Sequence, residues 1–256
     1  MATLDCVQFT YGSDNYGVLV HDEDSKQTAC IDAGDAQAAL DALSAQGWSL
    51  SHLLITHHHA DHTAGLVDIK EATKCQVIGP KPESRPIAGI DQHVGEGDQF
   101  EFADRQVGVL HTPGHTTDMI NFHFPDDNLV FTGDTLFSMG CGRLFEGDAG
   151  MMLKSINKLK ALPGSTMVYC AHEYTATNAR FALAVDPDNS ILQQRSEQVS
   201  ELRAAGQATV PTLLSLELQT NPFLRVSDAG IRKTLNMVDA SDEAVFAELR
   251  DRRNQY

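Results

Sequence analysis

The chain has 256 residues, enough for one α/β domain or for a larger domain with an appendage, and enough to bury a substantial core. It carries 19 Lys and Arg against 35 Asp and Glu, and the formal charge of −16 argues against nucleic acid or an anionic membrane as the principal partner. Because it shows no basic leader, no apolar run of transmembrane length and five scattered cysteines without a CxxC pair, we expect a cytoplasmic protein with reduced thiols.

Short apolar or β-branched runs alternate with Gly, Asp and Asn turns over the first two thirds of the chain, which predicts strands. We expect these strands at residues 7–10, 17–20, 28–31, 53–55, 76–78, 99–102, 107–111, 119–124, 129–132 and 167–170. Helical patterns cover residues 36–46, closed by Gly47, and residues 151–162. After about Tyr174 the pattern changes to helices with polar faces, which we expect at residues 178–185, 190–204 and 242–253. The sequence therefore predicts a mixed α/β (α+β) domain over residues 1–173 and a helical extension over residues 174–256.

The densest group of potential metal ligands is the run Thr56-His57-His58-His59-Ala60-Asp61-His62, directly after the apolar segment 53–55. An apolar strand that ends in such a run delivers it to the edge of a sheet. On a continuous helix His57 and Asp61 would share one face while His59 pointed away. These side chains can converge only if the loop is bent, so we predict a metal site at the strand's C-terminal end.

Three further potential ligands follow predicted strands. His115 lies in the turn after residue 111, Asp134 follows the strand at residues 129–132, and His172 follows the strand at residues 167–170. A single zinc ion takes about four ligands, so five histidines and two aspartates are too many for one ion and suit two ions that share a carboxylate. A set of imidazoles and carboxylates permits Zn, Fe or Mn and does not decide among them.

The pattern HxHxDH with its downstream ligands resembles that of the metallo-β-lactamase superfamily. The resemblance implies an αββα sandwich with two divalent metal ions at one edge, zinc being expected and iron or manganese the alternatives. It implies His57, His59 and His115 at the first ion, Asp61, His62 and His172 at the second, and Asp134 between them. It also implies that Asp32, in the segment Ile31-Asp32-Ala33-Gly34, orients a ligand.

Four other segments resemble glyoxalase II, the hydroxyacylglutathione hydrolases. They are Gly140-Cys141-Gly142-Arg143-Leu144-Phe145-Glu146-Gly147, His172-Glu173-Tyr174-Thr175 with Asn178, Asn221-Pro222-Phe223-Leu224-Arg225, and the basic tail from Leu249 to Tyr256. The resemblance implies a set of residues at the glutathione moiety, namely Arg143, Phe145, Tyr174, Asn178, Arg250 and Arg253. The chain departs from the family where Phe145 stands in place of tyrosine, which removes a hydroxyl contact, and in the tail, which aligns over only a few positions.

The resemblance implies hydrolysis of S-(2-hydroxyacyl)glutathione thioesters, with S-D-lactoylglutathione giving D-lactate and glutathione in the second step of methylglyoxal detoxification. Two adjacent cations would supply a bridging hydroxide near neutral pH and polarise the thioester carbonyl, while Asp61 and Asp134 offset part of their charge. The carboxylates of glutathione would explain why an acidic chain carries Arg143 and the C-terminal arginines. This arrangement requires the helical extension to fold back over the metal edge, in a chain that we expect to act as a monomer.

Other interpretations of the sequence stay open. A lactonase or another hydrolase of the superfamily is the nearest alternative, and a non-hydrolytic di-metal redox or binding protein is an alternative of another class. A phosphodiesterase acting on RNA is disfavoured because the chain has no basic stripe. Arg250 and Arg253 could pair with helix carboxylates such as Glu243 and Glu248 instead of a substrate.

Some conspicuous residues are expected to have structural roles. His58 alternates with the ligands of the run, so we expect it to pack or to support a ligand. Cys141 lies in the substrate loop without a base motif, so packing is expected rather than nucleophilic attack. The remaining histidines are expected to be structural or on the surface, and they are His21, His52, His93, His111 and His123.

Overall fold

A computed structural model of the protein describes residues 3–82 and 85–256; Met1, Ala2, Glu83 and Ser84 lie outside the described residues. The contacts divide the chain into two compact units, the first with residues 1–111 and 116–133, the second with residues 112–115 and 134–256. The boundary predicted at residues 173 and 174 was drawn from composition and stays a prediction. Among the helices of the described ranges, none has the length and apolar character that a bilayer span requires.

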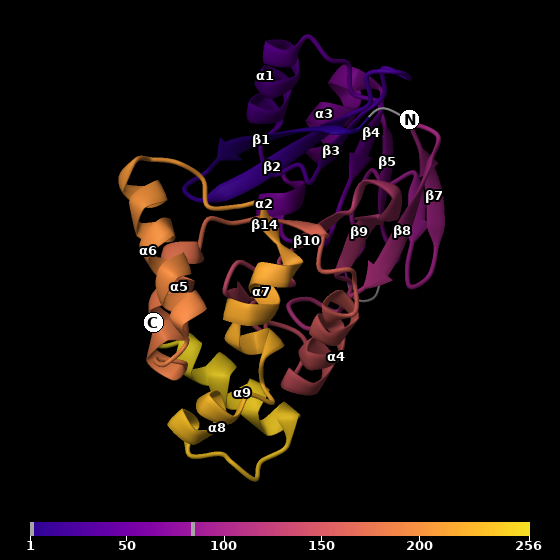
Figure 1. Cartoon of the computed structure of the whole chain (residues 1–256). Coiled ribbons are helices and arrows are strands. Elements are labelled where there is room, and N and C mark those ends of the chain that lie inside the picture. Colours follow the sequence, from indigo (N-terminus) through magenta and orange to yellow (C-terminus); the bar gives the residue numbers. More distant parts are fainter. Residues whose placement is uncertain (1–2, 83–84) are drawn as a thin grey trace. The chain divides into compact units, whose positions relative to one another are not determined.

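The first unit begins with a mixed sheet of six strands in sequential order (Figure 1). They are β1 (Asp5–Tyr11), β2 (Asn15–His21), β3 (Thr28–Ile31), β4 (His52–Leu54), β5 (Gln76–Pro80) and β6 (Gln92–Val94). The first three strands pair antiparallel, and β3 to β6 pair in parallel. Since parallel neighbours end at the same edge, the residues after β3 and β4 are brought together there.

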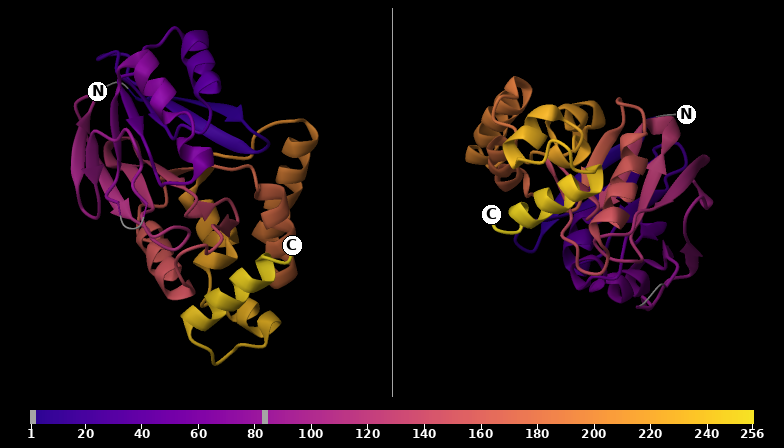
Figure 2. Two further views of the ribbon diagram at one scale, coloured as in Figure 1. Left: turned by 180° about the vertical axis from the view of Figure 1, so that it is seen from behind. Right: turned by 90° about the horizontal axis from the view of Figure 1, so that it is seen from below.

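Helices α1 (Ala36–Gln46) and α3 (Leu66–Thr73) lie together on one face of this sheet (Figures 1 and 2). The Asp35 side chain caps α1 by accepting a hydrogen bond from the Ala38 amide, and Gly47 ends the helix at a φ of 70°. Under these helices lies an apolar cluster whose buried members include Leu19, Leu53, Ile55, Leu66 and Val77. Burial of this cluster fixes the end of β4, from which the histidine run starts.

A second, antiparallel group of strands completes the first unit. They are β7 (Gln99–Phe102), β8 (Arg105–His111), β9 (Ile120–Phe124) and β10 (Leu129–Gly133), with a 3₁₀ turn at Pro125–Asp127. Buried and exposed residues alternate along β7, which is the pattern of a sheet with one covered face. Phe100 and Phe102 stand edge to face against Phe122 and Phe124, at ring distances of 5.9 and 6.1 Å.

The second unit contains four short strands and most of the helices. The strands are β11 (Leu136–Phe137), β12 (Gly140–Cys141), β13 (Met167–Cys170) and β14 (Thr212–Leu213). The helices are α4 (Ala149–Lys160), α5 (Thr175–Val185), α6 (Ser190–Ala204), α7 (Leu214–Thr220), α8 (Ala229–Leu235) and α9 (Asp242–Arg253), with a 3₁₀ turn at Pro222–Leu224. In Figure 2, α5 lies beside α6 and α9 beside α4, in agreement with the contacts between these helices. Side chains of Asp148, Asn189, Asp228 and Ser241 cap the starts of α4, α6, α8 and α9.

The structure confirms an α/β chain with a helical C-terminal region. Each predicted element is present, and its ends agree with the prediction or differ by at most three residues, as is usual where helices and strands fray. The elements that the sequence analysis did not name are short: α2 (Ala60–Thr63), α3, β6, β11, β12, β14, α7 and α8 have at most eight residues each. Such segments are too short for a hydrophobic period to stand out.

Candidate metal centre

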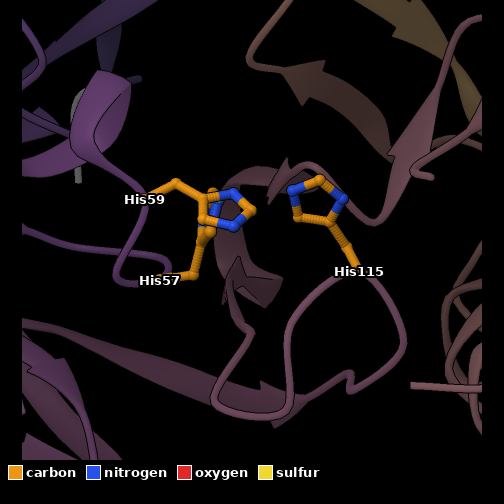
Figure 3. A group of neighbouring side chains, drawn as sticks. All are labelled: His57, His59 and His115. Atoms are coloured by element: carbon orange, nitrogen blue, oxygen red, sulfur yellow. The ribbon is translucent and has the colours of Figure 1, made fainter. Parts of the chain in front are cut away.

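In the first unit, the histidine run leaves β4 in an extended conformation and then bends. The Ile55 amide donates to Ile78, and the Ile120 amide donates to Thr56, so the chain is held on both sides up to the first histidine. His57 and His59 lie in the non-helical segment that follows, with His57 Nε2 3.1 Å from His59 Nδ1 (Figure 3). The bend thus brings together two imidazole nitrogens from alternate positions, as the spacing predicts.

Asp61 and His62 lie on α2, a single helical turn directly after the bend. Asp61 Oδ2 is 3.5 Å from His62 Nε2 and accepts a hydrogen bond from Asn15 Nδ2 at 3.1 Å. The Tyr11 hydroxyl donates to the Asp61 carbonyl at 2.9 Å. Gly34 passes so close that a Cβ there would lie 1.9 Å from the same carbonyl oxygen, so only glycine leaves room for α2 at this place.

Asp32 follows β3 and faces the histidine run across the parallel strands. Its φ of 61° turns the buried carboxylate toward the Thr56 amide, which donates to it at 2.8 Å, and toward His62 Nδ1, also at 2.8 Å. Thr56 Oγ1 in turn lies 3.0 Å from His57 Nδ1. Acceptors at both Nδ1 atoms leave the Nε2 atoms of His57 and His62 as the nitrogens that can bind a metal.

His58 points to a different partner from its neighbours. Its Nδ1 lies 2.9 Å from Asp118 Oδ1, and both side chains are almost fully buried. This pairing agrees with the packing or supporting role that its alternation with the proposed ligands predicts. Asp118 was not singled out, although it follows His115 by only three residues, because no motif marks it.

In the second unit, Asp134 stands between two histidines. His115 lies on the loop after β8 (Figure 3), and its Nε2 is 3.2 Å from Asp134 Oδ2. His172 follows β13, and its Nε2 is 3.2 Å from Asp134 Oδ1. The His115 Nδ1 is paired with the Arg143 carbonyl at 2.8 Å, and the His172 ring stacks on Tyr174 at 4.8 Å. Each oxygen of one carboxylate therefore faces a different imidazole, which is how a bridging ligand is arranged.

The spacing of these donor atoms fits metal ions. Two ligands about 2.0–2.1 Å from one tetrahedral zinc ion are separated by about 3.4 Å. The four pairs described above, His57 with His59, Asp61 with His62, and Asp134 with His115 and with His172, have separations of 3.1–3.5 Å. The imidazole and carboxylate chemistry of the set also suits divalent ions, so the residues present fit a metal-binding role.

The residues expected at the substrate lie in the second unit. The Arg143 guanidinium stands 5.8 Å from the centre of the Phe145 ring, and Phe145 is 60% exposed with its ring edge-on to His115. Tyr174 is the N-cap residue of α5, and Asn178 lies buried one turn further on. An exposed aromatic ring beside a cation is a surface that an amphipathic ligand can use.

The C-terminal arginines differ in their surroundings. Arg250 is only 5% exposed and donates from Nη1 to the Cys141 carbonyl at 2.6 Å, whereas Arg253 Nε donates to Asn178 Oδ1 at 3.0 Å. Burial, together with the neighbouring Arg250, lowers the pKa of Arg253 below the usual arginine value. Arg252, by contrast, pairs with a carboxylate of its own helix, because its Nε donates to Glu248 Oε1 at 2.7 Å.

Cys141 is expected to be inert in the folded protein. It is 4% exposed, and burial raises its pKa to about 11 even though Arg250 acts in the opposite direction. At neutral pH roughly one part in ten thousand is then thiolate, the form that reacts. Iodoacetamide at pH 7 should label Cys6, which is partly exposed, and leave Cys141 unmodified until denaturant is added, as followed by peptide mass spectrometry. Rapid labelling of native Cys141 would contradict its packing role.

Comparison with known proteins adds two family matches and several relatives. Residues 12–172 match the model of the metallo-beta-lactamase superfamily, and residues 173–256 match the model described as hydroxyacylglutathione hydrolase C-terminus. The hydroxyacylglutathione hydrolase of Brucella anthropi is 52% identical over 99% of this chain and 97% of its own, and that of Rhizobium meliloti is 50% identical over the whole of both chains. The crystal structure of ETHE1 from Myxococcus xanthus matches with a TM-score of 0.67 over the whole of both chains at 24% identity. A likeness at this identity shows the fold, and together with the superfamily match it confirms the predicted metallo-β-lactamase sandwich.

Proposed function

Because the chain belongs to the hydroxyacylglutathione hydrolase family of the metallo-β-lactamase superfamily, we propose that it hydrolyses S-(2-hydroxyacyl)glutathione thioesters. The observation that carries the proposal is the identity of 52% with a relative of that name over nearly the full length of both chains. S-D-lactoylglutathione is the substrate we propose, with D-lactate and glutathione as products, in the second step of methylglyoxal detoxification.

The proposed centre holds two divalent ions, zinc in the first place. His57, His59 and His115 would hold one ion, Asp61, His62 and His172 the other, and Asp134 both. When bound, the two ions would supply an acidified water and polarise the thioester carbonyl. The fit of the donor spacings and the acceptors at the Nδ1 atoms of His57, His62 and His115 support this assignment.

The protein's own side chains would bind and orient the thioester. We propose that residues 1–173 supply the metal ligands and residues 174–256 most of the substrate contacts. Arg143 and Arg253 would meet the carboxylates of glutathione, Tyr174 its peptide groups, and Phe145 its apolar edge. Asn178, which is buried, would act at the glutathione moiety through its hydrogen bond to Arg253. Arg250, through its hydrogen bond to Cys141, would contribute positive charge beside the same loop. The thiolate that leaves has an ordinary pKa of about 8.5, so no strong general acid is needed for its departure.

Two further proposals concern the cellular location and the oligomeric state of the protein. The five cysteines are thiols rather than disulfides and four are buried, which suits the reducing cytoplasm that we propose as the location. We also propose that the protein acts as a monomer.

Hydrolysis of S-D-lactoylglutathione by zinc-loaded protein, followed by loss of thioester absorbance, tests the proposal. We expect turnover together with about two bound metals per chain, loss of turnover after chelation, and its return on adding zinc. An N-acyl homoserine lactone and a simple acyl thioester without the glutathione peptide serve as comparison substrates. Full metal content with hydrolysis of the lactone alone would overturn the thioester assignment and favour a lactonase.

A further inference from the structure

A small hairpin in the second unit connects a proposed metal ligand to a proposed substrate contact. Strands β11 and β12 pair antiparallel, with Phe137 opposite Gly140, and Ser138 and Met139 form the two-residue turn. Asp134 precedes the hairpin by two residues and Arg143 follows it by two. Met139 has a φ of 53°, in the left-handed region that a side chain such as methionine rarely adopts. Something outside the hairpin must hold this turn in place.

Glu217, on α7, receives the hydrogen bonds of this turn. Its side chain is fully buried; Oε2 accepts from the Met139 amide at 2.7 Å and Oε1 accepts from the Ser138 hydroxyl at 3.0 Å. A third donor, Asn221 Nδ2, lies 3.1 Å from Oε2. The donors are all neutral, and burial raises the pKa of this carboxyl group. A buried carboxylate is costly to hold in its charged form, and here its three hydrogen bonds and the positive charge of Arg195 act against the effect of burial.

Two asparagines complete the support of the hairpin. Asn221 Nδ2 donates to the carbonyls of Phe137 and Gly140, at 3.1 and 3.0 Å, on both strands beside the turn. Asn178 Nδ2 donates to the Ser138 carbonyl at 2.9 Å. Gly140 has no room for a side chain, because a Cβ would lie 2.4 Å from Asn178 Nδ2. The backbone groups of the turn thus face acceptors and donors from α5, α7 and the residue that follows α7.

We infer that Glu217 is a positioning residue, which acts through the β11–β12 hairpin to set Asp134 at its one end and Arg143 at its other. The roles of these two residues rest on the proposed function; the hydrogen bonds of Glu217 do not. Arg143, directly after the hairpin, also contacts a further proposed ligand, because its carbonyl is paired with His115 Nδ1. One buried carboxylate therefore governs the placement of two ligands and one cationic side chain.

Two substitutions test whether Glu217 acts through its hydrogen bonds to the hairpin or through its negative charge. In Glu217→Gln the amide oxygen can accept from Met139 and Asn221, while its NH₂ donates to the Ser138 hydroxyl, which is able to accept. In Glu217→Ala all three bonds are lost. A displacement of about 1 Å at a catalytic group costs about 10²-fold in rate, so we expect kcat/KM of Glu217→Ala to fall by about that factor through both a lower kcat and a higher KM. We expect Glu217→Gln, which keeps all three hydrogen bonds, to stay close to the native protein.

Zinc affinity, measured by competition with a chromophoric chelator, gives a readout that does not depend on turnover. We expect Glu217→Ala to bind zinc about tenfold to 100-fold more weakly, with Glu217→Gln restoring the affinity. Glu197→Ala, which removes an exposed glutamate from α6, is the matched control and should change neither quantity.

Two results would overturn the inference. One is a folded Glu217→Ala protein with native zinc affinity, kcat and KM, lowered only in its melting temperature, because the bonds would then serve stability alone. The other is an equal loss in Glu217→Gln and Glu217→Ala. If the native protein binds two zinc ions but leaves S-D-lactoylglutathione intact, the proposed substrate fails, and the zinc affinities of the three variants still decide the role of Glu217.

Discussion

Replacing Asp134 by asparagine is expected to lower kcat for S-D-lactoylglutathione by about three orders of magnitude, equivalent to about 4 kcal/mol of transition-state stabilisation. The reason is the pairing of its two oxygens, one facing His115 and the other His172 at 3.2 Å each. Asparagine keeps the volume of the side chain but offers one acceptor oxygen, and its NH₂ is a donor that cannot bind a cation. The substitution also removes a negative charge that would offset two dications.

Metal content and fold must be measured beside turnover for this variant. We expect the Asp134→Asn protein to keep its circular dichroism spectrum and to lose at least one of two bound metals, by elemental analysis. Asp188→Asn, which changes an exposed carboxylate in the loop between α5 and α6, should retain native turnover and metal content. Turnover within tenfold of native in an Asp134→Asn protein that still holds two metals would contradict the bridging role.

The positions of the proposed ligands could be predicted from sequence because the segments that carry them follow strands. His57 comes after β4, Asp134 after β10 and His172 after β13. Each position can therefore be identified from residues that are close to it in the sequence. The bend of the histidine run was also predictable, because alternate residues converge neither on a helix nor on a straight strand. Asp32 reaches His62 because β3 and β4 pair in parallel, and only the family resemblance predicted this role from the sequence.

Residues that act across long sequence separations could not be predicted in this way. Glu217 contacts Ser138 across 79 positions, and it lies on a seven-residue helix that no hydrophobic period reveals. Arg250 offers a second example, since a guanidinium on a polar C-terminal helix is typical of an exposed side chain. Its hydrogen bond to Cys141 spans 109 positions and follows only from the tertiary fold.

Arg105 is a third such residue, and it has no part in the metal centre. Its side chain is 3% exposed on β8. Nη1 donates to Asp22 Oδ1 at 2.8 Å and to the Ala103 carbonyl at 2.9 Å, and Nε donates to Asp127 Oδ2 at 2.8 Å. Asp22 and Asp127 are buried as well, with 4% and 7% of their side chains exposed. One guanidinium therefore compensates two carboxylates in the interior of the first unit.

Substituting Arg105 by methionine is expected to lower the free energy of unfolding by about 3–5 kcal/mol, because removal of one partner leaves buried charges without compensation. Urea denaturation followed by fluorescence measures this change as a shift of the midpoint. Lys81→Met is the matched control: Lys81 pairs with Asp98 at 2.8 Å, but the two side chains are 57% and 41% exposed. An exposed pair contributes about 0–1 kcal/mol, so the control should barely move the midpoint. Equal shifts in both variants would contradict the assignment of the Arg105 network as a buried one.

The pH dependence of unfolding distinguishes lost charge pairing from lost packing at Arg105. Burial acts to raise the pKa of Asp22, but hydrogen bonds from Ser25 and Arg105 outweigh it and hold the pKa below the ordinary value of 3.8. A carboxyl group whose pKa is lowered in the folded state adds stability that is fully present above the unfolded value and is lost as the pH falls through the folded value. In Arg105→Met the lowering by Arg105 disappears, so the variant lacks the part of this stability that depends on the ionised Asp22 carboxylate. We therefore expect the difference in the free energy of unfolding between the native protein and Arg105→Met to be largest near pH 7 and to shrink as the pH falls through the folded-state pKa of Asp22, as measured by urea denaturation at a series of pH values. A difference that stays constant over this range would show that the methionine acts through packing alone.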